Sequence, residues 1–276
     1  MAITAQDVNK LRQMTGAGMM DCKVALTEAN GDFEVAVEIL RKKGQKISEK
    51  RADRETTEGI VYVQSDEAGT GAVLVALGCE TDFVSKNEEF QNLGKEILGI
   101  AYSKKPAGIE ALLSEKSGTT SLGEMLTELI GKIGEKIEVL AYEKMEGDLV
   151  VSYIHGTKKL GVLVALAGFA GPAAAEAGRD VAMQIAAMKP VSIDKDDVDP
   201  AIIQKELEIG REQARAEGKP ENMLDKIAEG KLNKFFKENT LLNQAFVKDG
   251  AITVANYLQS VNPNLKVKAF KRIAIG

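Results

Sequence analysis

The chain is short of the side chains that metal sites and nucleophilic enzymes use most often. Its 276 residues include one histidine, His155, and two cysteines, Cys22 and Cys79. The spacings CxxC, HExxH and GxxxxGK do not occur, so we expect no zinc site and no other metal or cofactor. A Ser-His-Asp or Cys-His arrangement would have to use His155. Cys79 follows an apolar run and has no basic neighbour, which favours a buried structural thiol over a catalytic one.

Long hydrophobic runs are also missing. No apolar stretch reaches the roughly 18 residues needed to cross a membrane. The N-terminus, Met1 to Thr4, lacks the basic and apolar regions of a signal peptide. A net charge of −5 argues against a general nucleic-acid-binding role. We therefore expect a cytoplasmic protein, with reduced thiols, that binds neither membranes nor nucleic acid directly.

What the sequence does contain is a series of segments with distinct patterns. Residues 1–43 predict three short helices, with caps at Thr4 and Asp32 and with glycine breaks at 16–18 and 30–31. The size and the glycine-broken first turn resemble the ubiquitin-associated class of three-helix domain. Residues 44–57 carry charges of both signs without apolar periodicity, which favours a solvated linker with some helix at most.

The middle of the chain contains a weak internal repeat. Strand patterns at 60–64 and 71–77 precede a helical pattern at 90–101, and strands at 149–154 and 161–166 precede a helix at 177–188. Both helices are followed by Lys-Pro. The repeat predicts an α+β core of two related lobes with antiparallel sheets, at 58–147 and 148–276. Further helices near 109–115 and 122–135, and strands at 137–143 and 265–269, complete the pattern.

A different pattern is inserted in the second lobe, at about 200–238. Apolar residues recur at 4-3-4 spacing, and the turn Gly218-Lys219-Pro220 separates two such stretches. This favours an antiparallel coiled-coil hairpin, about 20 residues a leg or roughly 30 Å long, over two ordinary core helices.

Residues 79–86 are the most informative stretch. The apolar run 72–77 predicts a buried strand, and Ser85 to Glu88 has the spelling of a capping box that begins the next helix. Asp82 and Phe83 are then expected on the loop between them. The pattern leaves two alternatives open. Phe83 and Val84 fold back to close the core, or the acid keeps the loop in water and Phe83 is presented to a partner.

The chain closely resembles the bacterial elongation factor Ts family over nearly its whole length. Residues 11–23 (LRQMTGAGMMDCK) are similar to the family's first signature, and residues 81–86 (TDFVSK) to its second. The turn at 153–156, with Gly218-Lys219-Pro220 and Glu229-Gly230, also matches. The family's plan is a three-helix domain, a two-lobed core and a projecting coiled coil.

The resemblance implies a guanine-nucleotide exchange factor for elongation factor Tu, in its GDP-bound and nucleotide-free forms, rather than an enzyme with covalent chemistry. It implies that the loop of Thr81, Asp82, Phe83 and Val84 contacts the G domain of that partner and helps to dislodge its magnesium ion. Leu11, Lys23 and His155 are further candidate contacts, with a solvated turn residue as the alternative for His155. The further C-terminal helix of some family members is expected to be absent.

Two other hypotheses come from different classes of protein. A ubiquitin-associated adaptor or scaffold would account for the first 43 residues but leaves residues 81–86 unexplained. An enzyme that uses Cys79 or His155 would require activity to be lost on Cys79→Ser while partner binding is kept. The exchange factor explains more of the chain than either.

Overall fold

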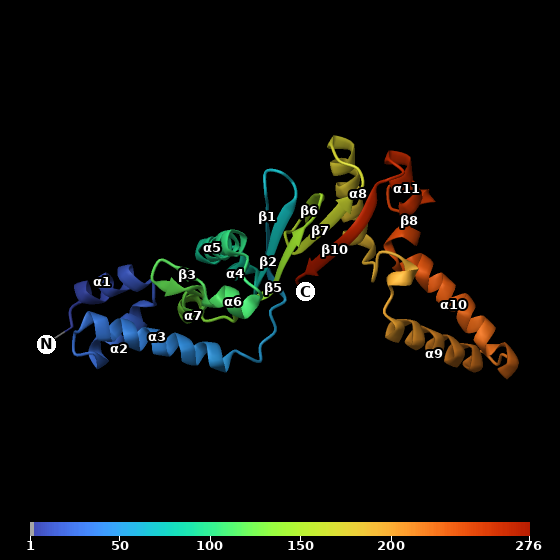
Figure 1. The fold of residues 1–276 in the computed structure, drawn as a ribbon. Coiled ribbons are helices and arrows are strands. Elements are labelled where there is room, and N and C mark those ends of the chain that lie inside the picture. The colour runs from blue at the N-terminus through green and yellow to red at the C-terminus, as the bar shows by residue number, and fades with distance from the viewer. Residues whose placement is uncertain (1–2) are drawn as a thin grey trace.

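The computed structural model describes residues 3–276, so Met1 and Ala2, the first residues of the predicted N-terminal domain, lie outside the described residues. Figure 1 shows an extended molecule in three parts. A three-helix domain lies at one end, a two-lobed core of sheets and helices lies in the middle, and a helical hairpin projects at the other end. The α+β class predicted from the sequence is confirmed.

The N-terminal domain comprises α1 (Ala5–Thr15), α2 (Met19–Glu28) and α3 (Phe33–Lys50). Both predicted caps are present, because Thr4 forms a capping box with Asp7, and Asp32 accepts the N–H groups of residues 34 and 35. The core of this domain is small and is made by Val8, Leu11, Cys22, Ala25, Leu26, Ala29 and Ala36. Such a core alone gives little stability.

Helix α3 is longer than the sequence predicted. It runs 18 residues to Lys50, so the first half of the predicted linker 44–57 is helical. Gly44 is buried, and a methyl group there would lie 3.1 Å from the Thr127 carbonyl oxygen and 3.4 Å from the Gly131 Cα. Helix α3 therefore packs on α7 (Leu122–Ile133) through a pair of glycines. Apolar periodicity in the sequence does not reveal such a contact, because glycine has no side chain.

The first lobe is built on an antiparallel sheet of β1 (Glu58–Ser65), β2 (Gly71–Cys79) and β5 (Ile137–Glu146), with β2 in the centre. Every residue of β2 is buried, as its continuous apolar pattern predicts. Helices α5 (Glu88–Lys104), α6 (Ile109–Ser114) and α7 supply the apolar side chains that pack on this sheet. The short strands β3 (Lys116–Ser117) and β4 (Thr120–Ser121) join α6 to α7.

The second lobe repeats this plan. Its sheet has the order β10-β7-β6, from β6 (Leu149–His155), β7 (Leu160–Ala167) and β10 (Lys266–Ala274). Helices α8 (Pro172–Met188) and α11 (Val254–Val261) pack in its core, beside β8 (Ala245–Phe246) and β9 (Asp249–Thr253). A third apolar cluster joins the two lobes, with Val61, Ala72, Leu74, Ala76, Met145, Val150, Leu163, Ala165 and Ile275 as its buried members.

The repeat extends to the ends of the equivalent helices. Lys105 after α5 and Lys189 after α8 both adopt a left-handed conformation, with φ of 45° and 48°. Their N–H groups donate to the carbonyl oxygens of Ala101 and Ile185. The proline that follows each lysine cannot continue the helix. The Lys-Pro pairs in the sequence therefore mark the same stop in both lobes.

The projecting hairpin consists of α9 (Pro200–Ala216) and α10 (Leu224–Asn239). Its legs have 17 and 16 residues, which gives about 25 Å, somewhat shorter than predicted. Gly210 packs on the backbone of Ala228, where an added methyl group would lie 3.0 Å from the Ala228 Cα. The two legs pack on each other, and their buried residues include this Gly210–Ala228 contact. Figure 1 shows the hairpin projecting from the second lobe.

Candidate functional site

The predicted loop after β2 contains one turn of helix, α4 (Asp82–Ser85), with Thr81 at its N-cap position. The prediction that Ser85 caps the next helix is wrong. The cap of α5 is Asn87, whose Oδ1 accepts the N–H groups of Glu89 at 2.8 Å and Phe90 at 3.3 Å. Ser85 is buried instead, and its hydroxyl donates to the Asp82 carbonyl oxygen at 2.9 Å. Asn is as good a cap as Ser, and its later position leaves room for α4.

This turn places Phe83 and Val84 on opposite sides. Phe83 is 81% exposed, whereas Val84 is 6% exposed and packs in the core of the first lobe. Neighbouring side chains on a helical turn point about 100° apart, and on this turn Val84 takes the inward direction. Of the two alternatives that the sequence left open, the structure has Val84 closing the core and Phe83 in solvent.

Asp82 lies beside Phe83 and pairs with Lys86 one turn later. The Lys86 Nζ donates to the Asp82 Oδ2 at 2.6 Å, and both side chains are at least half exposed. This hydrogen bond is the main cause that lowers the pKa of Asp82 and raises the pKa of Lys86. Phe83 is therefore flanked by an exposed ion pair with no net charge.

The base of the turn is held by two carboxylates that the sequence reasoning missed. The Glu135 carboxylate accepts the Thr81 N–H at 3.0 Å and the Thr81 hydroxyl at 2.8 Å. In the reverse direction, the Glu80 Oε1 accepts the Lys136 N–H at 2.6 Å. The segments 80–81 and 135–136 thus clamp each other beside the end of the β2–β5 ladder. We call this arrangement the reciprocal clamp.

Cys79 and His155, the catalytic candidates considered in the sequence analysis, are not joined by a hydrogen bond within residues 3–276. Cys79 is fully buried and its thiol donates to the Thr81 carbonyl oxygen at 3.2 Å. Burial raises the pKa of this thiol to about 12, so it stays protonated. His155 is exposed at the end of β6, and its Nδ1 lies 2.9 Å from the Tyr153 hydroxyl. Cys79 therefore has the structural role that the sequence favoured.

The N-terminal domain places its two candidate residues differently. Leu11 has no exposed surface and belongs to the core of the domain, so its side chain is not available to a partner. Lys23 is exposed on α2. Met19, Met20 and Val24 on the same helix are 53%, 67% and 49% exposed. Helix α2 has apolar residues on its exposed face as well as on its buried face. In a sequence, this pattern indicates an exposed apolar surface on a short helix.

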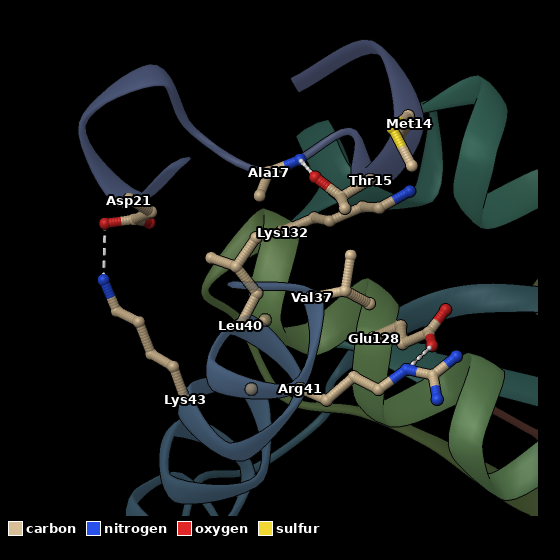
Figure 2. A pocket seen from close by; sticks show the side chains of 12 residues that line it. Met14, Thr15, Ala17, Asp21, Val37, Leu40, Arg41, Lys43, Glu128 and Lys132 are labelled. Carbon is tan, nitrogen blue, oxygen red and sulfur yellow. Dashed lines mark hydrogen bonds and ion pairs between the residues drawn. The ribbon is translucent and has the colours of Figure 1, made fainter. Parts of the chain in front are cut away.

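A cavity of about 300 Å³ is lined by residues of α1, α2 and α3 and by α7, beside the α3–α7 contact (Figure 2). Its rim is joined by ion pairs from Arg41 to Glu128, at 3.0 Å, and from Lys43 to Asp21. The Lys132 side chain crosses the cavity towards α1. Within residues 3–276, no three His, Cys, Asp or Glu side chains gather as metal ligands would. In the same range no helix combines the length and hydrophobicity needed to span a membrane.

Comparisons with known proteins identify a family that the chain resembles along its length. A family model described as "Elongation factor TS" matches residues 80–276. The "Elongation factor Ts" of Amoebophilus asiaticus is 56% identical over 276 residues, which is all of both chains. That of Cytophaga hutchinsonii is 57% identical over 275 residues, 99% of both chains. That of Clostridium perfringens is 47% identical over 261 residues, which is 93% of this chain and 86% of the relative.

Proposed function

The chain belongs to the elongation factor Ts family of translation elongation factors, and from this premise we propose that it releases GDP from elongation factor Tu. It acts in the cytoplasm by binding, without covalent chemistry. The observation that supports this proposal most strongly is the position of Phe83. A large apolar side chain that is 81% exposed on a clamped turn contributes little to the fold of the isolated chain.

Phe83 has the properties of an interface anchor. Aromatic side chains contribute a large contact area with few rotatable bonds, so little entropy is lost when they are buried by a partner. Thr81 and Val84 fix the turn from below, through the Glu135 carboxylate and the lobe core. Phe83 therefore inserts into the G domain, while Asp82 and Lys86 lie beside it at the rim of the contact.

Exchange needs no nucleophile on this chain. A G protein holds GDP by a phosphate-binding loop and by a magnesium ion that bridges phosphate oxygens. A protein that binds the nucleotide-free form more tightly than the GDP form weakens GDP binding by the same factor, because the two equilibria are linked. Insertion of Phe83 near the magnesium and phosphate site of the partner supplies that preference.

A second contact is provided by the N-terminal domain. We assign this contact to the exposed face of α2, with Lys23 and the neighbouring methionines Met19 and Met20. Leu11 supports it indirectly by holding α1 against α2. His155 is exposed and remains a candidate contact from the second lobe.

The test is release of a fluorescent GDP analogue from elongation factor Tu, followed with increasing concentrations of this chain. We expect a saturable rise in the release rate that is largely lost in Phe83→Ala. The matched control is Met223→Ala, which removes another exposed apolar side chain, 45% exposed, at the tip of the hairpin. Release that is no faster with the wild-type chain than without it would refute the proposed function.

A further inference from the structure

We propose that Arg51 and Glu80 are positioning residues that hold the N-terminal domain at a fixed orientation to the Phe83 turn. This inference deepens the proposed function and rests on it for its kinetic consequences. It also makes a structural prediction that needs no partner protein.

The contact joins the end of α3 to the base of the turn. The Arg51 Nη1 donates to both Glu80 carboxylate oxygens, at 2.8 and 3.0 Å. The two side chains are only 35% and 17% exposed, so the pair is more shielded from water than the other ion pairs of the N-terminal domain. Partial burial acts to raise the pKa of Glu80, but the Lys136 N–H and the Arg51 guanidinium together keep it below its ordinary value.

Two further contacts fasten the irregular segment 51–57 to the same place. The Lys136 Nζ donates to the Arg54 carbonyl oxygen at 3.0 Å, and the Thr56 hydroxyl donates to the Glu138 Oε1 at 2.7 Å. Most of this segment is exposed, as its charges predict, but these two contacts fasten it to the first lobe. It runs along the start of β5, next to the reciprocal clamp that holds the Phe83 turn.

The glycine contact between α3 and α7 explains why a second point of attachment matters. Gly44 and Gly131 bring the helix backbones close, Ile47 packs on the first-lobe core, and Arg41 pairs with Glu128. All of these contacts lie within residues 41–47 of α3, so they restrain the direction of the helix less than a contact further along it does. Arg51 lies seven residues beyond Gly44, about 10 Å along the helix. A contact at that distance fixes the direction of α3, and with it the place of α2.

A partner that contacts both α2 and Phe83 binds a two-part surface. If the spacing between α2 and Phe83 is fixed, binding of the partner at one of them brings the other into place as an intramolecular contact. The entropy that would be lost in orienting a mobile N-terminal domain is then not lost on binding. Breaking the Arg51–Glu80 pair therefore lowers affinity. The rate of GDP release at saturation is kept, because Glu135 still holds the Phe83 turn.

The experiment compares Arg51→Ala, Glu80→Gln and the double variant in the GDP-release assay. Glu80→Gln keeps an acceptor for the Lys136 N–H while removing the charge. Each single variant is expected to raise the half-saturating concentration by about threefold to tenfold without changing the saturating rate. The double variant is expected to match the single variants, and Arg51→Lys to restore most of the affinity. Lys50→Ala is the control, since it removes an exposed cation that has no ion pair among the described residues.

A second measurement uses the chain alone. Spin labels at the exposed positions Glu28 on α2 and Lys95 on α5 report the distance between the N-terminal domain and the first lobe. The distance distribution is expected to broaden in Arg51→Ala and to remain narrow in Lys50→Ala and Arg51→Lys. An unchanged distribution in Arg51→Ala overturns the inference, as does a lower saturating rate at unchanged half-saturation. A wild-type chain that fails to stimulate release refutes the proposed function instead, and the distance measurement still decides the role of Arg51.

Discussion

Phe83 and Val84 are adjacent in sequence but face opposite environments, so truncating each in turn separates recognition from folding. About a fifth of the Phe83 surface is covered in the free chain, because 81% of it is exposed. A buried phenylalanine covers about 200 Å², so the covered part is about 40 Å² and contributes at most about 1 kcal/mol to folding. Phe83→Ala is therefore expected to leave the free energy of unfolding within about 1 kcal/mol of wild type.

The exposed part of Phe83 sets the size of the functional effect. Burial of the remaining roughly 160 Å² by a partner is worth up to about 4 kcal/mol at ~25 cal/mol per Å². Anchors of this kind lose about 2 kcal/mol or more on truncation, which corresponds to roughly thirtyfold in affinity or rate. GDP release from elongation factor Tu is expected to fall by at least tenfold at subsaturating concentrations of Phe83→Ala.

Val84→Ala is the matched change with the opposite expectation. It removes two buried methyl groups and leaves a cavity in the core of the first lobe, which costs about 2 kcal/mol. Urea unfolding with an unchanged slope should report this loss, while stimulation by the folded variant stays within about threefold of wild type. A role for Phe83 as an interface anchor is refuted if Phe83→Ala loses about 3 kcal/mol or more of stability, or if it stimulates release as well as wild type does.

Three other predictions test the rest of the structure. Gly131→Ala places a methyl group 2.8 Å from the Gly44 Cα, so we expect it to lower the free energy of unfolding in urea by about 1–3 kcal/mol. The control Gly99→Ala meets open space and should not lower it, and equal effects of the two changes would contradict the close approach of α3 and α7. Replacing residues 204–230 by a short glycine linker should leave the circular dichroism of both lobes native-like, because the two legs of the hairpin pack on each other, and an aggregated product argues against this. Because burial raises the pKa of Cys79, only the unfolded chain loses the thiol proton as pH rises from 9 towards about 12. The free energy of unfolding should therefore fall more steeply with pH in wild type than in Cys79→Ala, and parallel curves of this free energy against pH would refute a raised pKa for the buried thiol.

The parts of the fold that the sequence predicted correctly are those set by local patterns. The continuous apolar run of β2, the caps at Thr4 and Asp32 and the Lys-Pro stops of α5 and α8 each involve residues within a few positions of one another. Such patterns are local and are little affected by the rest of the chain. The repeat of the two lobes was visible for the same reason.

The features that were predicted wrongly or missed depend on contacts between residues that are far apart in the sequence. Ser85 and Asn87 are equally suited to cap α5, and the burial of Val84 in the lobe core decides between them. Glu135 holds Thr81 across 54 positions of sequence, which no local pattern encodes. Leu11 matched a family signature, but the match could not distinguish a residue that contacts a partner from one that supports its neighbours.

The repeated plan of the two lobes gives the molecule an internal comparison for the origin of its Phe83 turn. In the first lobe residues 80–87 connect β2 to α5, whereas in the second lobe residues 168–171 connect β7 to α8. The difference is four residues, the length of α4. The ββα unit of the second lobe therefore folds without a turn like α4. In the first lobe this turn is an insertion between β2 and α5 that the ββα fold does not require. Adaptation to a changed partner surface can then proceed by altering four residues and their clamp, while both sheets keep their register.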